Sequence, residues 1–155
     1  MDNPDLTVII PTFNEEQNIG AMVEALQKVF RFSGIEGEIL VVDDSSSDRT
    51  IAIVRELAER YSNLRLIVRE SDHGLSQSVA EGFAHAGGAI IQVIDADLSH
   101  PPELIPEFFR AVREGADIVV GSRYMEGGAI GEWPLKRRII SLGATALGRI
   151  LFPDI

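Results

Sequence analysis

The sequence predicts an α/β protein with a doubly wound, mostly parallel sheet. Short apolar runs rich in Val and Ile are nearly continuous instead of alternating, which is typical of strands buried on both faces. Longer segments with helical patterning separate these runs, as crossover connections between parallel strands require. The chain has 155 residues, of which 45% are hydrophobic and 25% charged, and this composition fits one globular domain. The predicted strands cover residues 6–10, 39–42, 66–68, 90–94 and 118–120.

The first two predicted helices have recognisable starts. Asn14 is followed three residues later by Gln17, which predicts an N-cap with a capping-box partner for a helix ending near residue 32. Ser47 or Asp48 would cap a second helix over residues 49–61.

Two further helices follow the third and fourth predicted strands. The first of them covers residues 75–86, where Gly82 would allow close packing of the backbone. Pro101 and Pro102 suit the first turn of the next, over residues 103–114, because a missing N–H has little effect there.

The last part of the chain has a different pattern. Residues 123–132 contain three glycines and little apolar periodicity, so we expect a loop. Residues 135–152 have a helical pattern, and no closing strand follows. We therefore expect the chain to be a fragment of a longer protein.

Composition and charge exclude several classes of protein. The formal net charge of −10 argues against a nucleic-acid partner, since phosphate backbones would be repelled. The absence of cysteine excludes disulfides and thiolate metal sites. The acidic N-terminus is unlike a signal peptide, and no apolar run approaches the roughly 20 residues that span a bilayer. We expect a cytoplasmic protein whose membrane contact is at most peripheral.

Polar sequences follow four of the predicted strands. In open α/β sheets, ligands bind beyond the carboxyl ends of the strands, so these segments should lie at one edge of the sheet. Carboxylates follow three of the four strands. The segments are residues 11–15, 43–48, 95–100 and 121–124.

The most informative segment contains Asp95, Ala96 and Asp97. Carboxylate oxygens suit hard cations such as Mg²⁺ or Mn²⁺, which take one or two carboxylates together with substrate phosphates. Such a metal would neutralise charge on a departing diphosphate. In the alternative, one Asp caps the following helix and the other is solvated. For an isolated pair of aspartates, this capping alternative would be preferable to a metal site. Because other predicted strands also end in carboxylates, we prefer the metal site here.

Other charged residues near the strand ends have two interpretations each. Asp44 could contact the ribose or base of a nucleotide, or belong to a polar loop of ordinary capping residues. Glu15 could belong to the site, or equally be a first-turn acid stabilised by the helix dipole. Arg123 and Arg137, the latter in the basic run 136–138, form a local positive cluster that suggests phosphate capture. The alternative is a solvated basic helix start.

These motifs together resemble a known family. Residues 8–15 and 41–46 are similar to the inverting glycosyltransferases with the GT-A fold. Further segments narrow the resemblance to the dolichyl-phosphate, or polyprenyl-phosphate, mannosyltransferases over essentially the whole chain. These segments are residues 95–102, 121–124, 127–128, 133–137 and 139–141.

The resemblance implies a GT-A sheet that is incomplete at the C-terminus. It implies one catalytic domain over residues 1–155, with a nucleotide-binding part (1–122) and an acceptor loop with the start of an acceptor helix (123–155). The implied reaction is metal-dependent, inverting transfer of mannose from GDP-mannose to dolichyl or polyprenyl phosphate. Mg²⁺ or Mn²⁺ would be the cofactor, and the full-length protein would act at the cytoplasmic face of a membrane. The acceptor is already an anion, so no strong general base is needed.

The resemblance also assigns roles to individual residues. The nucleotide would be held by Pro11, Phe13, Glu15, Val42 and Asp44. Asp95, Ala96 and Asp97 would bind metal, diphosphate and sugar. Ser99, at a position that is often Gln in relatives, would complete the metal site. Arg123 and Arg137 would bind the acceptor phosphate and, with Asp97, form the catalytic set.

Several alternatives remain open at this point. One is a UDP-glucose-dependent polyprenyl-phosphate glucosyltransferase, and another is a sugar-nucleotide-binding fragment without turnover. A nucleotidyltransferase would need a Gly-rich basic loop after the first strand, and a dehydrogenase would need G-x-G-x-x-G there. A receiver domain would explain an acidic pocket but not Arg123, Trp133 and Arg137 together.

Overall fold

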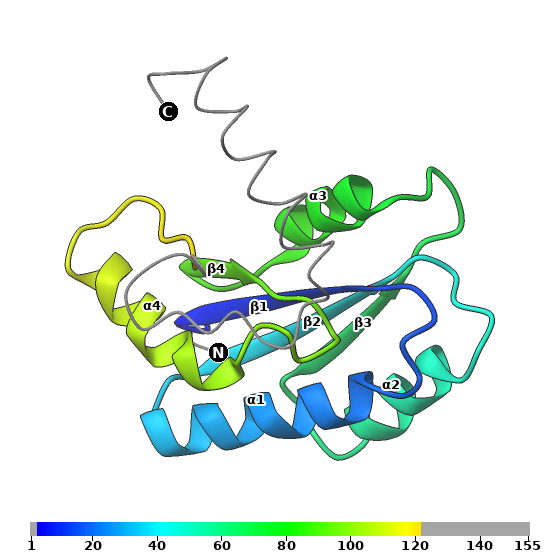
Figure 1. The fold of residues 1–155 in the computed structure, drawn as a ribbon, viewed down its shortest axis with the longest axis horizontal. Helices are drawn as coiled ribbons and strands as arrows, with labels where there is room; N and C mark the ends of the chain where they lie inside the picture. Colours follow the sequence, from blue (N-terminus) through cyan, green and yellow to red (C-terminus); the bar gives the residue numbers. More distant parts are fainter. Residues whose placement is uncertain (1–2, 122–155) are drawn as a thin grey trace, which may run out of the picture. The chain divides into compact units, whose positions relative to one another are not determined.

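A computed structural model of the chain describes residues 3–121. Contacts within the chain divide it into Met1–Val119 and Val120–Ile155, and the following description concerns the first of these units. The elements follow one another as β1 (Leu6–Thr12), α1 (Ile19–Ser33), β2 (Gly37–Asp43), α2 (Thr50–Ala58), β3 (Leu64–Val68), α3 (Leu75–His85), β4 (Ile90–Val93), the 3₁₀ helix η1 (Pro102–Leu104) and α4 (Ile105–Arg113) (Figure 1).

The four described strands form one parallel sheet in the order β3-β2-β1-β4. The chain moves outward from β1 through β2 to β3, and β4 then returns to the other side of β1. This change of direction creates a topological switch point beside β1, where the carboxyl ends of parallel strands leave room for a ligand. The predicted parallel α/β sheet is therefore confirmed.

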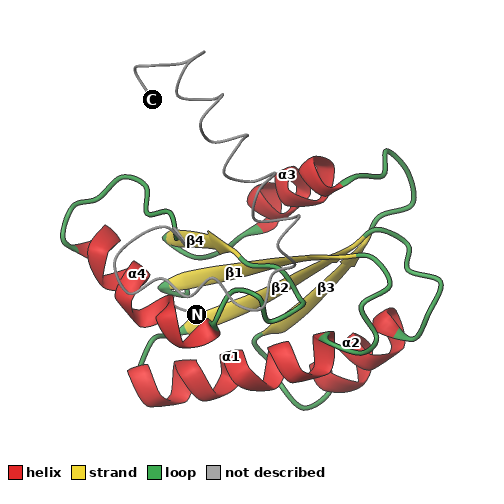
Figure 2. Cartoon of the chain, viewed as in Figure 1, coloured by secondary structure: helices red, strands yellow, loops and turns green. Residues whose placement is uncertain are grey.

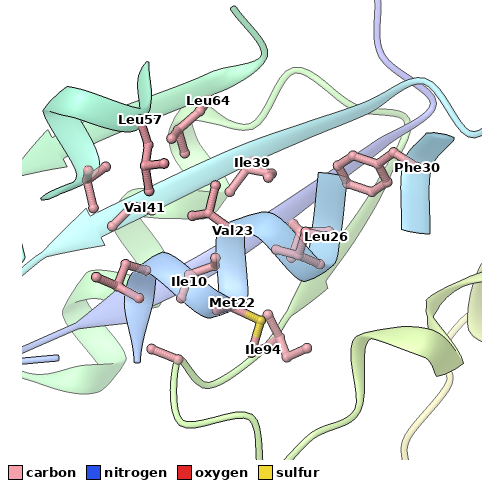
Figure 3. Packing of buried hydrophobic residues seen from close by; sticks show 14 of the residues in the cluster. Ile10, Met22, Val23, Leu26, Phe30, Ile39, Val41, Leu57, Leu64 and Ile94 are labelled. Carbon is pink, nitrogen blue, oxygen red and sulfur yellow. The ribbon is translucent and has the colours of Figure 1, made fainter. Parts of the chain in front are cut away.

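Helices cover both faces of this sheet, with α1, α2 and α4 on one face and α3 on the other (Figure 2). The inner side of α1 is apolar at helical spacing and packs against β1 and β2 (Figure 3). On the opposite face, Ile9, Leu40 and Val42 are fully buried. Gly82 allows α3 to approach this face closely, because a Cβ at residue 82 would lie 2.6 Å from Cγ2 of Ile9. The prediction for Gly82 is thus confirmed.

The predicted capping box at the first helix is wrong. Helix α1 begins at Ile19, and Asn14 instead adopts a left-handed backbone with φ of 56°. The side-chain oxygen of Asn14 accepts hydrogen bonds from the backbone N–H groups of Ser47 (2.9 Å) and Asp48 (3.4 Å). Asn14 therefore connects the β1–α1 loop to the β2–α2 loop, a contact between distant segments that local spacing does not reveal. Asp48 does supply an oxygen to the start of α2, through Thr50 N–H at 2.9 Å.

The predicted fifth strand is also wrong within the described part of the chain. Residues 118–120 form no strand there, and Ile118 is 82% exposed. An apolar run becomes a strand only where a neighbouring strand supplies hydrogen bonds. No strand within residues 3–121 pairs with residues 118–120.

In residues 3–121, no helix is both long and apolar enough to cross a bilayer. The predicted loop at 123–132 and helix at 135–152 lie outside the described residues.

Candidate functional site

A cleft of about 260 Å³ opens at the carboxyl edge of the sheet, where the sequence predicts a ligand. Its walls come from the end of β1, the residue after β2, the start of α3 and the segment after β4. The lining residues are Pro11, Thr12, Phe13, Glu15, Asp44, Leu75, Ser78, Asp95, Ala96 and Asp97. We call this site the cleft. A second hollow, of about 450 Å³, is lined by Phe13, Asp44, Ser45, His73 and Gly74. Phe13 and Asp44 belong to both, so the two adjoin.

The Asp95–Ala96–Asp97 segment alternates between exposed and buried side chains. Ala96 is only 3% exposed and belongs to the main apolar cluster, whereas both aspartates are exposed. Oδ1 of Asp97 accepts the N–H of Ser99 at 2.9 Å, and Nδ1 of His100 lies 3.6 Å from Oδ2 of Asp95. The buried alanine fixes the backbone between the two carboxylates, so both are presented at the edge of the cleft.

The donor set of this segment fits a hard divalent cation. Asp95 and Asp97 offer only carboxylate oxygens, which Mg²⁺ and Mn²⁺ prefer. Within residues 3–121, no three His, Cys, Asp or Glu side chains are grouped so that they could hold an ion by themselves. Two carboxylates completed by oxygens of a phosphate-bearing ligand are the arrangement typical of Mg²⁺ in nucleotide sites.

The capping alternative for this segment is wrong. The next helix, η1, begins at Pro102 and has no side-chain cap, since Pro101 occupies its N-cap position. Oδ1 of Asp97 accepts the N–H of the loop residue Ser99.

The two adjacent aspartates at the end of β2, Asp43 within the strand and Asp44 just after it, have different environments. Asp43 is fully buried, and its Oδ2 accepts hydrogen bonds from the hydroxyls of Thr12 and Ser46, both at 2.7 Å. Its Oδ1 accepts the N–H of Ser46, also at 2.7 Å. Asp43 therefore holds the ends of β1 and β2 together, and only Asp44 faces the cleft.

Asp44 is held by three donors. Its Oδ1 accepts from Nη1 of Arg69 (2.8 Å) and Nδ1 of His73 (2.9 Å), and its Oδ2 accepts from Gly74 N–H (2.7 Å). The side chains of Arg69 and Asp44 are only 8% and 13% exposed. Burial raises the pKa of Asp44, but the bonds from His73 and Gly74 and the charge of Arg69 outweigh burial and leave this pKa below its ordinary value. The carboxylate is therefore ionised at neutral pH and positioned before any ligand arrives.

Sequence reasoning missed Arg69 and His73. Asp43 pairs with Val68 across β2 and β3, so the residues that follow, Asp44 and Arg69, lie side by side beyond the sheet. Arg69 directly follows the third predicted strand. That position could have identified Arg69 as a site residue, because the carboxyl ends of parallel strands share one edge of the sheet.

The other predicted nucleotide contacts are placed as follows. Pro11 and Phe13 line the cleft, and the Phe13 ring is 61% exposed. Glu15 lines the cleft as well, while its Oε2 accepts from Nδ2 of Asn18 at 2.8 Å. Val42 is fully buried beneath α3 with Leu40, because alternate side chains of a strand point to the same face. Its side chain is therefore not among those that line the cleft.

The remaining predicted site residues lie beside the cleft or beyond the described part. Ser99 is exposed and is not a lining residue, although its N–H contacts Asp97. Arg123 and Arg137 lie outside the described residues, and their roles stay predictions.

The chain is similar to proteins of known family. It is 43% identical over 150 residues to a dolichol-phosphate mannosyltransferase of Pyrococcus furiosus, a match covering 97% of this chain and 42% of the relative. It is 36% identical over 154 residues to a dolichol-phosphate mannosyltransferase of Saccharomyces cerevisiae, covering 95% of this chain and 55% of the relative. The chain thus spans about half the length of these relatives.

Solved structures share the fold. A Pyrobaculum calidifontis mannosyltransferase in complex with GDP-Man and Mn²⁺ superposes with a TM-score of 0.61 at 30% identity, covering 78% of this chain and 35% of that one. S. aureus TarS in complex with UDP-GlcNAc superposes with a TM-score of 0.54 at 30% identity, covering 60% of this chain and 26% of that one. The predicted GT-A type of sheet is confirmed by these neighbours. Residues 7–154 match the model of glycosyl transferase family 2, and the chain belongs to that family.

Proposed function

We propose that the protein containing this chain transfers mannose from GDP-mannose to dolichyl or another polyprenyl phosphate, with inversion at the anomeric carbon. The observation that carries the proposal is the pair of exposed carboxylates, Asp95 and Asp97, beside a pocket where Asp44 is already fixed. The names of the relatives and the GDP-Man and Mn²⁺ of the Pyrobaculum neighbour support this donor and acceptor.

The described residues suit the donor half of this reaction. Asp95 and Asp97 would hold Mg²⁺ or Mn²⁺, which when bound neutralises charge on the diphosphate. Asp44 and Phe13 would hold the nucleoside, and Ala96, which lies between the two aspartates and lines the cleft, would lie beside the diphosphate or sugar. These contacts would orient the anomeric carbon toward the acceptor.

The acceptor half needs little proton chemistry. A phosphate oxygen of the lipid attacks the anomeric carbon, the bond from that carbon to the diphosphate breaks, and GDP leaves with the electron pair. The attacking group is already an anion, so positioning and charge stabilisation suffice. Arg123 and Arg137 are proposed to hold the lipid phosphate. Since that lipid resides in a membrane, we also propose peripheral contact of the full-length protein with a cytoplasmic membrane face.

Calorimetric titration tests the donor site. The chain is titrated with GDP-mannose, UDP-glucose and GDP, each with and without Mn²⁺. We expect Mn²⁺-dependent binding of GDP-mannose and GDP. Tighter binding of UDP-glucose would favour the glucosyltransferase alternative, which the UDP-GlcNAc complex of TarS keeps open. Absence of metal-dependent binding of every nucleotide would overturn the proposal.

Matched variants assign the metal to its ligands. Asp95→Asn and Asp97→Asn should remove the Mn²⁺-dependent part of binding without loss of folding, because both side chains are exposed. Asp117→Asn makes the same chemical change at an exposed residue that lines neither hollow, and it should bind like the parent chain.

A further inference from the structure

Each of the four described strands is followed by a loop with one non-glycine residue in a left-handed backbone. These residues are Asn14 (φ of 56°), Ser45 (60°), Asp72 (55°) and Leu98 (58°). Such conformations are uncommon outside glycine and collect at functional sites. We propose that Asn14 is a positioning residue, which fixes Phe13 relative to Asp44 before the donor nucleotide binds. The inference rests on the proposed function and goes further, since Asn14 lines neither hollow.

The side chain of Asn14 joins the β1–α1 loop to the β2–α2 loop. Its Oδ1 accepts hydrogen bonds from the N–H of Ser47 (2.9 Å), the hydroxyl of Ser47 (3.3 Å) and the N–H of Asp48 (3.4 Å). These three bonds all end on one oxygen, so the link requires an acceptor at this position and not the amide nitrogen. A left-handed backbone is less costly for asparagine than for most residues, which suits Asn14 to this place.

The backbone of the β1–α1 loop is held by the same partner segment. Three successive N–H groups donate to side-chain oxygens there: Asn14 to Oγ of Ser46 (2.8 Å), Glu15 to Oγ1 of Thr50 (2.8 Å) and Glu16 to Oδ2 of Asp48 (3.1 Å). The Ser46 hydroxyl in turn donates to Oδ2 of Asp43 at 2.7 Å, and Asp43 is fully buried. The loop is thus fixed to the core through the end of β2.

Phe13 depends on this link more than Asp44 does. Both residues line the cleft and the second hollow. Asp44 is already held by three donors from the segment between β3 and α3. The ring of Phe13 is 61% exposed, so packing restrains it little, and its place depends on the backbone that continues into Asn14. A nucleotide therefore meets a preformed pair, and the loop need not be ordered during binding.

Two substitutions separate the oxygen of Asn14 from its backbone conformation. Asn14→Gly permits the left-handed backbone and removes the oxygen, whereas Asn14→Asp restores an oxygen at the same reach. Residue 14 is exposed, so neither change disturbs the core. Calorimetry measures the affinity for GDP and for pyrophosphate, each with Mn²⁺. Pyrophosphate lacks the nucleoside that would contact Phe13 and Asp44. The charge added in Asn14→Asp acts on both anions, so the ratio of the two affinities is compared.

The expected effect is confined to the nucleoside. Asn14→Gly should lower GDP affinity by about 5- to 30-fold, the factor that corresponds to ordering the backbone of about one residue. Pyrophosphate affinity should be unchanged, so the ratio falls by the same factor. Asn14→Asp should restore the ratio of the parent chain. A merely structural role, in which glycine only lowers stability, would leave this ratio unchanged.

Asn63→Gly is the matched control at the opposite edge of the sheet. Asn63 also joins distant segments, since its Nδ2 donates to the carbonyl of Gly37 (2.7 Å) and its Oδ1 accepts from Gln27 (2.8 Å). Gly37 begins β2, whereas the cleft lies beyond the end of that strand. Asn63→Gly should therefore lower the midpoint of thermal unfolding and keep the ratio of GDP to pyrophosphate affinity.

The outcomes are distinct. The inference is overturned if Asn14→Gly keeps the ratio of the parent chain, if Asn14→Asp fails to restore it, or if Asn63→Gly lowers it equally. In these three cases, GDP binding by the parent chain leaves the proposed function standing. If the parent chain binds no GDP in the presence of Mn²⁺, the proposed function fails and the inference fails with it. Circular dichroism and thermal unfolding verify that each variant is folded at the temperature of the titration.

Discussion

Replacement of Arg69 by methionine tests whether the Asp44 site is held by a buried ion pair. Nη1 of Arg69 donates to Asp44 Oδ1 at 2.8 Å, and Nη2 donates to the carbonyl of Asp72 at 2.7 Å. Nη1 also donates to Oγ of Ser78 at 3.4 Å. Methionine fills a similar volume and removes all three bonds. It leaves the Asp44 carboxylate, of which 13% is exposed, with only His73 and Gly74 as partners.

The expected loss of stability follows from these contacts. A hydrogen bond to a charged group contributes about 1.5–3 kcal/mol, and removing one partner of a buried ion pair costs about 3–5 kcal/mol when no other partner remains. Because His73 and Gly74 still bind Asp44, we expect Arg69→Met to lower the free energy of unfolding by about 2–4 kcal/mol.

A matched control lies on β3, the strand that Arg69 directly follows. Arg65 also pairs with a β2 carboxylate, that of Glu38 at 2.5 Å, but the Arg65 side chain is 48% exposed. Thr7 and Gly87 N–H still bind Glu38 without it. Arg65→Met should therefore lower the free energy of unfolding by about 1 kcal/mol or less.

Urea denaturation of both variants at pH 7 measures the difference. A double-mutant cycle with Asp44→Asn isolates the coupling between Arg69 and Asp44, which should exceed about 1 kcal/mol. The reasoning is refuted if Arg69→Met is no more destabilising than Arg65→Met, or if the cycle shows no coupling.

Three other predictions concern stability. Burial raises the pKa of Glu38, but bonds from Thr7, Gly87 and Arg65 outweigh burial and hold this pKa below its ordinary 4.5. The ionised form therefore stabilises the fold above that pH, and this contribution is lost as pH falls through the lowered pKa. The urea midpoint should consequently fall less in Glu38→Gln than in the parent between about pH 5 and about pH 3, and parallel curves would contradict this. Gly20→Ala should raise the free energy of unfolding by about 0.5–1 kcal/mol, because the new Cβ would lie at an ordinary contact distance of 3.8 Å from Cγ2 of Ile53. Gly82→Ala should lower the free energy of unfolding, because the new Cβ would lie 2.6 Å from Cγ2 of Ile9. Thermal unfolding that ranks the two variants in the opposite order would contradict this packing. Asp43→Ala leaves the hydroxyls of Thr12 and Ser46 without their acceptor and should lower the free energy of unfolding by about 2–4 kcal/mol. A loss below about 1 kcal/mol would contradict this prediction.

The pattern of apolar residues in the sequence was sufficient to predict the four observed strands and the position of the cleft. The runs at residues 6–10, 39–42, 66–68 and 90–94 each overlap an observed strand, because strands buried on both faces are apolar throughout. The same logic placed Asp44, Asp95 and Asp97 at one edge, since carboxyl ends of parallel strands must coincide.

The failures concern contacts between segments distant in sequence. Asn14 has the composition of a helix cap, but its amide bonds to the β2–α2 loop more than 30 residues away. Arg69 reaches Asp44 only because β2 and β3 are neighbours in a particular register. Val42 is the last residue of an apolar run next to the site. Side chains alternate between the two faces of a strand, and this alternation places the side chain of Val42 on the face that α3 covers.

Because Ala96 is buried between two exposed aspartates, the three consecutive positions should tolerate different kinds of substitution. At residue 96 the main apolar cluster limits volume, so glycine or serine could replace alanine where leucine would force the core apart. At residues 95 and 97 the side chains are exposed, and the proposed metal site restricts their oxygen chemistry. A saturation library over the three positions, scored separately for folding and for Mn²⁺ binding, should therefore lose folding at the centre and metal binding at the flanks.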